Sequence, residues 1–475
     1  MAQIALPLGT NVVTSGPPHK AILKLALPTV AAMLAQSLVN EIDLIFFAYL
    51  PHPESSDAQA ALVPSLIVLW LFGGSLSAIS VGTQAFTARR YAEGKVEDAG
   101  AVLANAAFFA LTAGVVFSVL GYLAMPYILG ATLKTGGAYD AAVGYSRWRL
   151  LGITSMATTF AFKAFFDGLG KTHVHLVASV VMNILNIALC LLFIYGNAAL
   201  GLPKMGMAGA GFAGFVATYV GLGVMIVYAL QPEYRSRFRP FDPKKLDRAL
   251  TWSILKLSIP SAVATIVGMI GFYLFISIAN RLDVMHLAGG SGVGVEPVNG
   301  AATSVVIEIL KFAITACLAF GTSTATLVAQ SIGEKDPDKA ERFGWVSVKL
   351  GLGIFGVVGM LVAVFAPLVL RVFTHSPAVH EASLVPLRMM GLCTPLLAVG
   401  MIVTQALFGA GNTRFVAIAE GLLHFGLFVP LAWLLGIALH FGLVGIWAAG
   451  AIYMLALAAI MSWKFRTGDW KTIRI

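Results

Sequence analysis

Charge is scarce in this sequence. Asp, Glu, Lys and Arg make up 11% of the 475 residues, whereas 58% are hydrophobic, and an average soluble domain has about 25% charged residues. Several segments without any charge are long enough to cross a bilayer as a helix, which takes about 20 residues. Among them are 58–88, 99–133, 205–232, 257–280, 312–333, 350–370, 389–413 and 421–463. These segments exclude an ordinary water-soluble domain and predict an all-α polytopic membrane protein.

Cysteines are also scarce, and the motifs of common enzymes are missing. The three cysteines, Cys190, Cys317 and Cys393, lie apart in apolar segments with no pairing or metal-ligand spacing. The patterns G-x-x-x-x-G-K-[ST], H-E-x-x-H and G-x-S-x-G do not occur. A G-x-G-x-x-G sequence at 351–356 lies within an apolar span rather than after a strand. We therefore predict packing roles for the cysteines, no metal site, no cofactor and no enzyme activity.

Positive charge exceeds negative charge, with a formal net charge of +9. The basic residues cluster in every second loop, above all at 234–248, and cytoplasmic loops carry such an excess because Lys and Arg resist translocation. The first 19 residues lack the pattern of a cleaved signal peptide. We therefore expect a multi-pass protein of the bacterial cytoplasmic (inner) membrane with both termini in the cytoplasm, and a lipid bilayer rather than nucleic acid as its partner.

Apolar patterning predicts twelve transmembrane helices. We place them at 21–49, 61–91, 101–126, 142–167, 174–196, 205–230, 252–281, 298–332, 341–372, 381–409, 414–437 and 441–463. The predicted order is a cytoplasmic tail, a six-helix lobe, a basic cytoplasmic linker, a second six-helix lobe and another cytoplasmic tail. Their ranges are 1–20, 21–230, 231–250, 251–463 and 464–475.

Four short sequences recur in the same order in the two halves. The first half contains "ILKLALPTV" at 22–30, "GTQA" at 82–85, "DGLGKT" at 167–172 and "GMAGAGFA" at 206–213. The second half contains "ILKLSIPSA" at 254–262, "GTST" at 321–324, "FGAGNT" at 408–413 and "GLVGIWAA" at 442–449. Gly94 and Gly333 each follow twelve residues after the start of the second match. Because each half has an even number of spans, the repeats are parallel, which is typical of alternating-access transporters.

These features resemble the multidrug and toxic compound extrusion (MATE) family over about residues 22–463. The resemblance is carried by K-L-x-x-P at 24–28 and 256–260, by "QSLVNEID" at 36–43 and by "NILNIALCLLFIYG" at 183–196. It is also carried by a G-x-G-x-T loop before the fifth and eleventh spans. The resemblance implies a secondary active antiporter that exports organic small molecules, such as drugs, toxic compounds or secondary metabolites, in exchange for protons or sodium ions.

Two carboxylates lie in the first predicted span, where an ionised acid costs about 2.5–3.5 kcal/mol to insert. Helical spacing places Gln36, Asn40 and Asp43 on one face and Glu41 on the opposite face. Such acids must face a cavity, bind a cation or carry a proton. We predict that Asp43 takes up a proton from one side of the membrane and releases it to the other.

The fifth span has a matching polar stripe at Asn183, Asn186 and Cys190. We predict that this stripe meets Asp43 inside the first lobe. The resemblance equates Asp43 with the family's cation-coupling aspartate and Asn186 with its fifth-span asparagine, with Glu41 as a further candidate. Cys190 stands where many prokaryotic members have a second acid. Since hard cations prefer oxygen ligands, this thiol favours protons over sodium.

Charges in the second half form two pairs at helical spacing, Glu308 with Lys311 and Glu420 with His424. The first pair is either a structural ion pair or a substrate contact, and we predict a gate or a packing contact for the second. Gly268 occupies the position at which sodium-coupled relatives carry a seventh-span acid, which again favours protons. Our predicted substrate cavity comprises Gln36, Asn40, Asn183, Glu308, Lys311 and Arg388.

The function predicted from the sequence is therefore proton-driven export of a small organic molecule by a monomer. A sodium-coupled exporter and a lipid-linked substrate flippase of related fold are the alternatives within transport. A channel or receptor and an intramembrane enzyme are the alternatives outside it. The charge of the substrate stays open, because organic cations suit Asp43 and Glu41, whereas a carboxylate suits Lys311 or Arg388.

Overall fold

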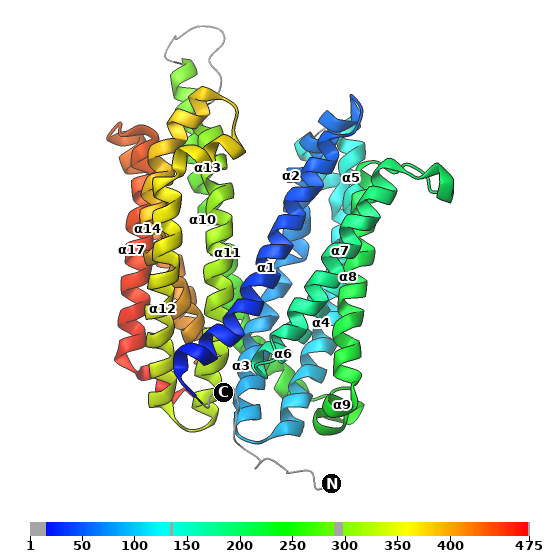
Figure 1. Ribbon diagram of the computed structural model, residues 1–475, viewed down its shortest axis with the longest axis vertical. Coiled ribbons are helices and arrows are strands. Elements are labelled where there is room, and N and C mark those ends of the chain that lie inside the picture. Colours follow the sequence, from blue (N-terminus) through cyan, green and yellow to red (C-terminus); the bar gives the residue numbers. More distant parts are fainter. Residues whose placement is uncertain (1–15, 134–135, 289–297, 474–475) are drawn as a thin grey trace. The chain divides into compact units, whose positions relative to one another are not determined.

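The computed structural model describes residues 16–133, 136–288 and 298–473, except for the side chains of 39–40 and 286–288. The regular secondary structure of the described residues is helical. The exception is an isolated β-bridge between Asn197 and Leu202, which flanks the short 3₁₀ segment η2 (Ala198–Leu200). The chain divides into two units (Figure 1). Among the described residues, unit 1 lies within 27–262, and unit 2 comprises 16–26 and those within 263–473.

Eleven helices in the described residues are long and apolar enough to cross a membrane. They are α1 (Pro18–Ala48), α2 (Glu54–Phe72), α4 (Val96–Leu133), α7 (His173–Tyr195), α8 (Met207–Leu230), α10 (Arg248–Ala288), α11 (Val298–Gly333), α12 (Pro337–Val364), α14 (Pro377–Gly409), a composite helix at Thr413–Ala438 and α17 (Gly442–Thr467). The composite helix consists of α15 (Thr413–Gly421), the π-helical segment η4 (Leu422–Phe428), α16 (Val429–Trp433) and the π-helical segment η5 (Leu434–Ala438).

The predicted single span 142–167 is two shorter helices in the structure, α5 (Gly137–Leu151) and α6 (Ile153–Gly168). The break is at Gly152, whose N–H donates to Trp148 O at 3.2 Å and to Arg149 O at 3.1 Å. A Cβ at this position would lie 3.1 Å from Arg149 O and 3.4 Å from Thr218 Oγ1 on α8. Glycine therefore lets the end of α5 turn and pack closely against α8.

Two further predicted spans are interrupted. The span 61–91 is α2, the 3₁₀ segment η1 (Gly74–Ala78) and α3 (Ile79–Ala92). The span 341–372 is α12 followed by α13 (Ala366–Phe373). Pro367 explains the second break, because it lacks an N–H and its ring clashes with the carbonyl four residues earlier.

The sequence repeats appear as equal backbone turns. Gly170 and Gly411, in the two G-x-G-x-T loops, both have positive φ, at 76° and 83°. Gly206 and Gly442, which begin the last repeat, have φ of 55° and 59°. The left-handed region is costly for residues with a Cβ, so glycine is needed at each of these turns.

One proposed pairing of the repeats is wrong. Gly94 has a φ of 79°, and its turn is closed by Lys95 N donating to Arg90 O at 2.9 Å. The equivalent bond in the second half runs from Asp336 N to Ser331 O at 3.0 Å, which puts Lys335, with φ 62°, at the place of Gly94. Gly333 instead ends α11. The second half therefore uses a lysine in a left-handed conformation.

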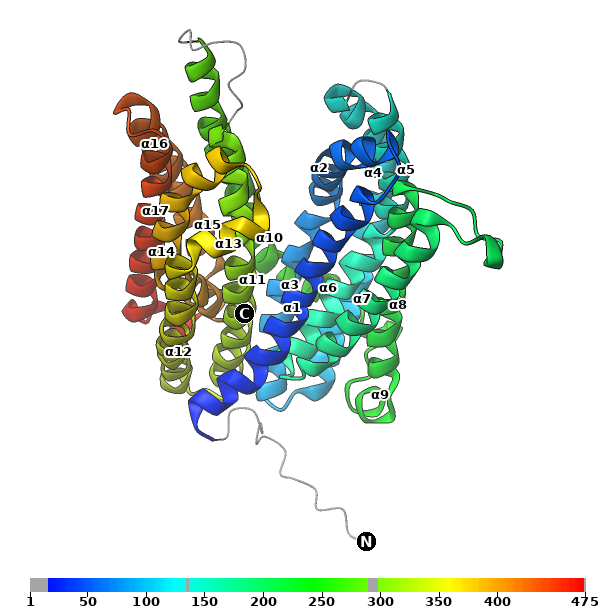
Figure 2. The same cartoon turned by 45° about the horizontal axis from the view of Figure 1, so that its top comes forward.

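In unit 1, α7 and α8 run side by side, and α4 packs against α5 and α6 (Figure 2). The segment after α8 holds α9 (Pro232–Phe238) and the 3₁₀ segment η3 (Pro243–Lys245). Asn105 of α4 binds this segment, donating to Lys245 O at 2.9 Å and accepting from Asp247 N at 2.8 Å and Thr251 Oγ1 at 2.9 Å. The connection that leads into α10 is therefore fixed to α4.

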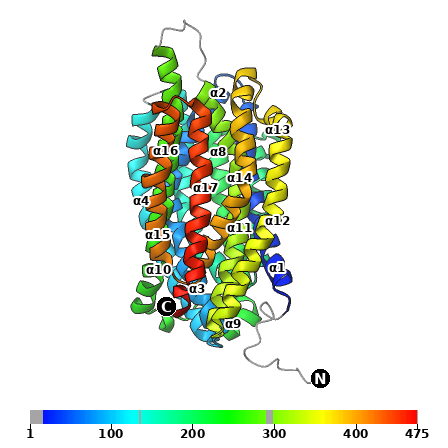
Figure 3. The same ribbon diagram turned by 90° about the vertical axis from the view of Figure 1, so that its left-hand side faces the viewer.

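In unit 2, α14 is the central helix and packs against α11, α12 and α17 (Figure 3). The last element among the described residues is a short 3₁₀ segment, η6 (Asp469–Thr472). Its Trp470 is buried, stacks on Phe465 with ring centroids 4.7 Å apart, and donates from Nε1 to Phe465 O at 2.7 Å. The tail after α17 is thus anchored to its own unit.

Candidate functional site

Asp43 of α1 contacts the polar stripe of α7 in unit 1. The Cys190 thiol lies 3.6 Å from Asp43 Oδ1 and 3.9 Å from Asn186 Oδ1, so it can donate its single hydrogen to either oxygen. The side chains of Asp43, Asn186 and Cys190 are all buried. The structure therefore brings together the two polar faces that the helical spacing indicated.

The core around this contact is apolar and tightly packed. Phe47, one turn after Asp43, is fully buried in a cluster that includes Met125 of α4 and Tyr145 of α5. Tyr195, at the end of α7, donates its hydroxyl hydrogen to Phe46 O at 2.8 Å. These contacts join the second half of α1 to α7 and fix the position of the Asp43 carboxyl group.

Arg149 of α5 also belongs to this site, although the sequence did not predict it as a site residue. Its positive charge acts on the Asp43 carboxylate, and its guanidinium lies 5.8 Å from the centre of the Tyr145 ring. Within the described residues, Arg149 acts on Asp43 through its charge and not through a hydrogen bond. Its side chain is half-buried on α5, three residues before the break at Gly152.

Gly214 of α8 makes room for Arg149. A Cβ at position 214 would collide with Arg149 Nη1. A small cavity of about 10 Å³ lies at the same place, lined by Arg149, Gly152 and Thr218 among others, and this is the size that one water molecule needs. Because Gly214 has no side chain, the Arg149 guanidinium can lie between α5 and α8.

The other residues predicted for unit 1 are more dispersed. Asn183 is buried on α7, and within the described residues its Nδ2 has no hydrogen-bond partner. Glu41 is half-buried and Gln36 is exposed. The side chain of Asn40 lies outside the described residues.

Unit 2 pairs the charges that were predicted to pair. Lys311 Nζ lies 2.6 Å from Glu308 Oε2 on α11, and both side chains are partly exposed. Arg388 of α14 is exposed. His424 Nδ1 lies 3.2 Å from Glu420 Oε2 and 2.9 Å from Glu420 O. Whether these residues contact substrate stays a prediction.

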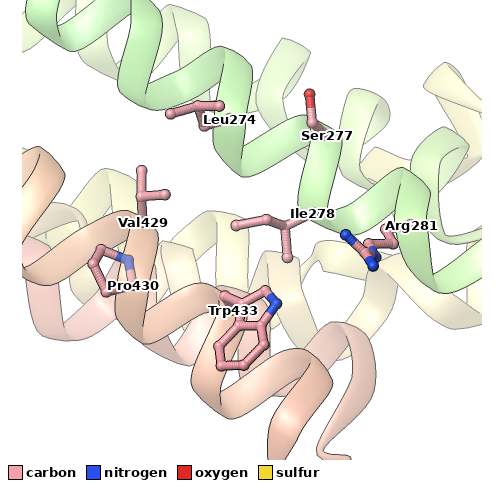
Figure 4. A pocket seen from close by; sticks show the side chains of 7 residues that line it. All are labelled: Leu274, Ser277, Ile278, Arg281, Val429, Pro430 and Trp433. Atoms are coloured by element: carbon pink, nitrogen blue, oxygen red, sulfur yellow. The ribbon is translucent and has the colours of Figure 1, made fainter.

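An open apolar pocket of about 390 Å³ lies in unit 2 between α10 and α16 (Figure 4). It is lined by Leu274, Ser277, Ile278, Arg281, Val429, Pro430 and Trp433. None of these residues belongs to the predicted cavity. In the part of the chain that the structure describes, no group of three or more His, Cys, Asp or Glu is placed to hold a metal ion.

A comparison with protein families matches the MatE family twice, at residues 28–192 and 260–434. The two matches fall on the two sequence repeats. Together they cover more than half of the chain, which establishes membership of the family.

Curated relatives match over nearly the whole chain. The "Probable multidrug resistance protein NorM" of Thermotoga maritima is 27% identical over 463 residues, which are 95% of this chain and 93% of the relative. The "Probable multidrug resistance protein YoeA" of Bacillus subtilis is 23% identical over 423 residues, 88% of each chain.

Solved structures confirm the predicted all-α polytopic membrane fold. An outward-facing MATE family transporter of the MOP superfamily superposes with a TM-score of 0.83 at 24% identity, over 97% of this chain and 98% of that one. A MOP superfamily transporter from Pyrococcus furiosus gives a TM-score of 0.84 at 23% identity, over the same shares. The chain therefore belongs to the MatE family of membrane transporters and is not an enzyme.

Proposed function

We propose that this protein is a multidrug exporter of the cytoplasmic membrane, driven by a proton gradient, and that Asp43 binds the coupling proton. The curated relatives are named as multidrug resistance proteins, which supports export of organic molecules. The observation that carries the proton assignment is the environment of Asp43, a buried carboxyl group with a thiol on one side and a guanidinium within electrostatic range.

This environment suits a proton better than a sodium ion. A sodium ion at Asp43 would meet the Cys190 thiol where a hard cation prefers oxygen. The positive charge of Arg149 opposes either cation, so the ligand set decides between them. A proton needs no shell of oxygen ligands, because it bonds to the carboxylate and converts it to a neutral hydrogen-bond donor.

The pair of Asp43 and Arg149 also provides a mechanism of exchange. With Asp43 ionised, its charge and that of Arg149 cancel, and a cationic or neutral organic molecule can bind without net repulsion. When Asp43 takes up a proton, the site becomes positively charged, since the guanidinium stays protonated. A bound organic cation is then expelled. Loss of the proton on the other side restores the starting state.

Everted membrane vesicles test this proposal. We expect an imposed pH gradient to drive accumulation of a fluorescent organic cation, and we expect Asp43→Asn to reduce the initial rate to background. Asp140→Asn, which neutralises an exposed acid on α5, is the matched control and should transport normally. Full activity of Asp43→Asn would overturn the proton assignment. Transport that requires sodium would support the sodium-coupled alternative, and flipping of a lipid-linked substrate without dye transport would support a flippase.

We further propose a monomer with both termini in the cytoplasm. Two exposed positions can test the orientation, namely Ser236 in α9, beside the basic segment, and Ala198 in the loop after α7. In intact cells, a membrane-impermeant maleimide should label Ala198→Cys and not Ser236→Cys. The reverse pattern would show the opposite orientation. Light scattering of the purified protein would detect a dimer.

A further inference from the structure

Unit 2 contains a largely buried cluster of three polar side chains that the proposed mechanism does not use. Glu420 lies in the last turn of α15, His424 lies in the π-helical segment η4, and Tyr453 lies on α17. Tyr453 donates its hydroxyl hydrogen to Glu420 Oε2 at 3.1 Å, and His424 Nδ1 lies 3.2 Å from the same oxygen. His424 and Tyr453 are buried, so water does not solvate this cluster freely.

The hydrogen bonds define which imidazole nitrogen carries a proton permanently. His424 Nδ1 faces two acceptors, the carbonyl oxygen and the carboxylate of Glu420. A nitrogen between two acceptors must be the donor, so Nδ1 is protonated and Nε2 has the free lone pair in the neutral ring. Protonation of Nε2 produces an imidazolium ion whose counter-charge, Glu420, is already in contact with it.

The surrounding helices are shaped to hold the imidazole ring. A Cβ at Gly271 of α10 would lie 2.5 Å from His424 Cδ2, and a Cβ at Gly268 would lie 3.8 Å from Nε2. The Tyr453 ring lies 4.8 Å from the imidazole, centre to centre. The π-helical turn that carries His424 is rare in helices and occurs frequently at functional sites.

No fixed cation competes for Glu420 among the described residues packed against His424. Gly268 and Gly271 of α10 face the imidazole, α16 contains only Val, Pro, Leu, Ala and Trp, and η4 has no other titratable group. The titratable groups that face His424 are Glu420 of α15 and Tyr453 of α17. The cluster therefore alternates between a net charge of −1 with a neutral ring and zero with an imidazolium.

We propose that Glu420, His424 and Tyr453 form a second proton-binding site, in unit 2, with the exchangeable proton on His424 Nε2. Its contribution to coupling rests on the proposed proton-driven export, where a second site permits two protons per cycle instead of one. Its ability to bind a proton does not depend on transport. Tyr453 is a positioning residue, since it holds the Glu420 carboxylate and not the imidazole proton.

Nuclear magnetic resonance of the purified protein, with isotope-labelled histidine, tests proton binding without substrate or gradient. The His424 signal is identified by its loss in His424→Gln. We expect its Nε2 to take up a proton when the sample is acidified. We expect Glu420→Gln to lower the protonated fraction at the same acidic pH by at least about threefold, because the counter-charge is lost. An Nε2 that stays unprotonated down to the pH at which the protein unfolds, or is unaffected by Glu420→Gln, would overturn the proposal.

The number of protons exchanged per substrate tests the role in coupling. In proteoliposomes, the substrate gradient that just balances a fixed pH gradient gives this number. We expect His424→Gln to lower it from two to one, while His380→Gln, at a half-buried histidine of α14, leaves it at two. An unchanged number in His424→Gln would refute the role of this site in coupling while leaving the assignment of Asp43 intact. Absence of any proton exchange in the unmodified protein would refute the proposed function, and the magnetic resonance titration would still decide whether His424 binds a proton.

Discussion

At the scale of single residues, the central feature is a carboxyl group and a guanidinium that act on each other from α1 and α5 without direct contact. Charges that lie in one network show coupling energies of about 0.5–3 kcal/mol in double-mutant cycles. We expect Arg149→Gln to destabilise the protein by leaving Asp43 without its counter-charge. The double variant with Asp43→Asn should recover part of the loss, because no buried charge then lacks a partner.

Unfolding midpoints in detergent measure this coupling. Arg147→Gln is the control, since Arg147 is exposed on the same helix and should not couple to Asp43. Strictly additive effects of Arg149→Gln and Asp43→Asn would show that the two groups do not interact.

Gly214 provides a second test of the same site. Gly214→Ala places a methyl group against Arg149 Nη1, so the guanidinium must shift away from its position between α5 and α8. We expect a reduction of pH-driven transport of about tenfold, which corresponds to about 1.4 kcal/mol. Gly223→Ala on the same helix meets nothing within 4 Å and should be active. Equal activity of the two variants would contradict the positioning of Arg149 by Gly214.

The sequence was sufficient to predict part of this site. The spacing of Asp43, Asn186 and Cys190 predicted which faces of two helices meet, because helical periodicity is a local property. The place of Arg149 depends on the break at Gly152 and on the missing side chain at Gly214. Both are tertiary features, and neither is visible in the periodicity of the predicted span 142–167.

At the scale of elements, the turns between helices show how far the two repeats have diverged. Lys335 has a left-handed backbone where Gly94 stands in the first half. A residue with a Cβ in the left-handed region destabilises the folded state by about 1–2 kcal/mol. A new glycine offsets part of the gain, because its greater chain entropy stabilises the unfolded state by about 0.4–1 kcal/mol. We therefore expect Lys335→Gly to stabilise the protein by about 0.5–1 kcal/mol.

The unfolding midpoint of Lys335→Gly measures this gain. Gly94→Ala is the converse variant, and because nothing lies within 4 Å of a Cβ at position 94, its expected destabilisation comes from the backbone alone. A lower midpoint for Lys335→Gly would contradict the strain assigned to this turn.

The carboxy-terminal segment η6 is a second element with a clear energetic basis. Trp470 is fully buried, and Trp→Ala substitutions in cores cost about 3–5 kcal/mol. We expect Trp470→Ala to release the tail and to increase the rate of tryptic cleavage after Lys464 or Arg466 by about 100-fold. An unchanged cleavage rate would show that the tail does not depend on Trp470.

Ion pairs should keep this tail docked over a wide pH range. Lys471 Nζ lies 2.8 Å from Asp338 Oδ1 and 2.6 Å from Glu341 Oε2, and these hydrogen bonds raise the pKa of Lys471. A lysine whose pKa is raised in the folded state contributes its full stabilisation of the fold below its ordinary pKa of about 10.4. This contribution is lost only as the pH rises through the raised pKa. The hydrogen bond from Lys464 lowers the pKa of Asp469, whose contribution is lost only as the pH falls through that lowered value. The tail should therefore stay docked between pH 5 and 9. Cleavage rates, each divided by the rate of trypsin on an unfolded reference peptide at the same pH, should be constant over this range. A steep change in this ratio would contradict these pairs.

At the scale of the whole molecule, the fold was predictable from charge and apolar length, because the bilayer restricts spanning segments to helices of set length. The twelve expected spans all correspond to helices of the structure, three of them in interrupted form. The interruptions at Gly152, Pro367 and the Gly73–Gly74 pair were not expected, since glycine and proline are common in membrane helices and do not by themselves show where a helix breaks. The unit boundaries lie inside α1 and α10, close to Pro28 and Pro260.

The most direct measurement is the movement of protons that a substrate gradient causes in proteoliposomes without a sodium gradient. A pH-sensitive dye trapped inside reports the movement. We predict that an outward gradient of an organic cation drives protons inward, that the rate is unaffected by added sodium, and that Asp43→Asn abolishes it while Asp140→Asn does not. Substrate movement without any change of internal pH, or equal proton movement in Asp43→Asn, would contradict proton exchange at Asp43.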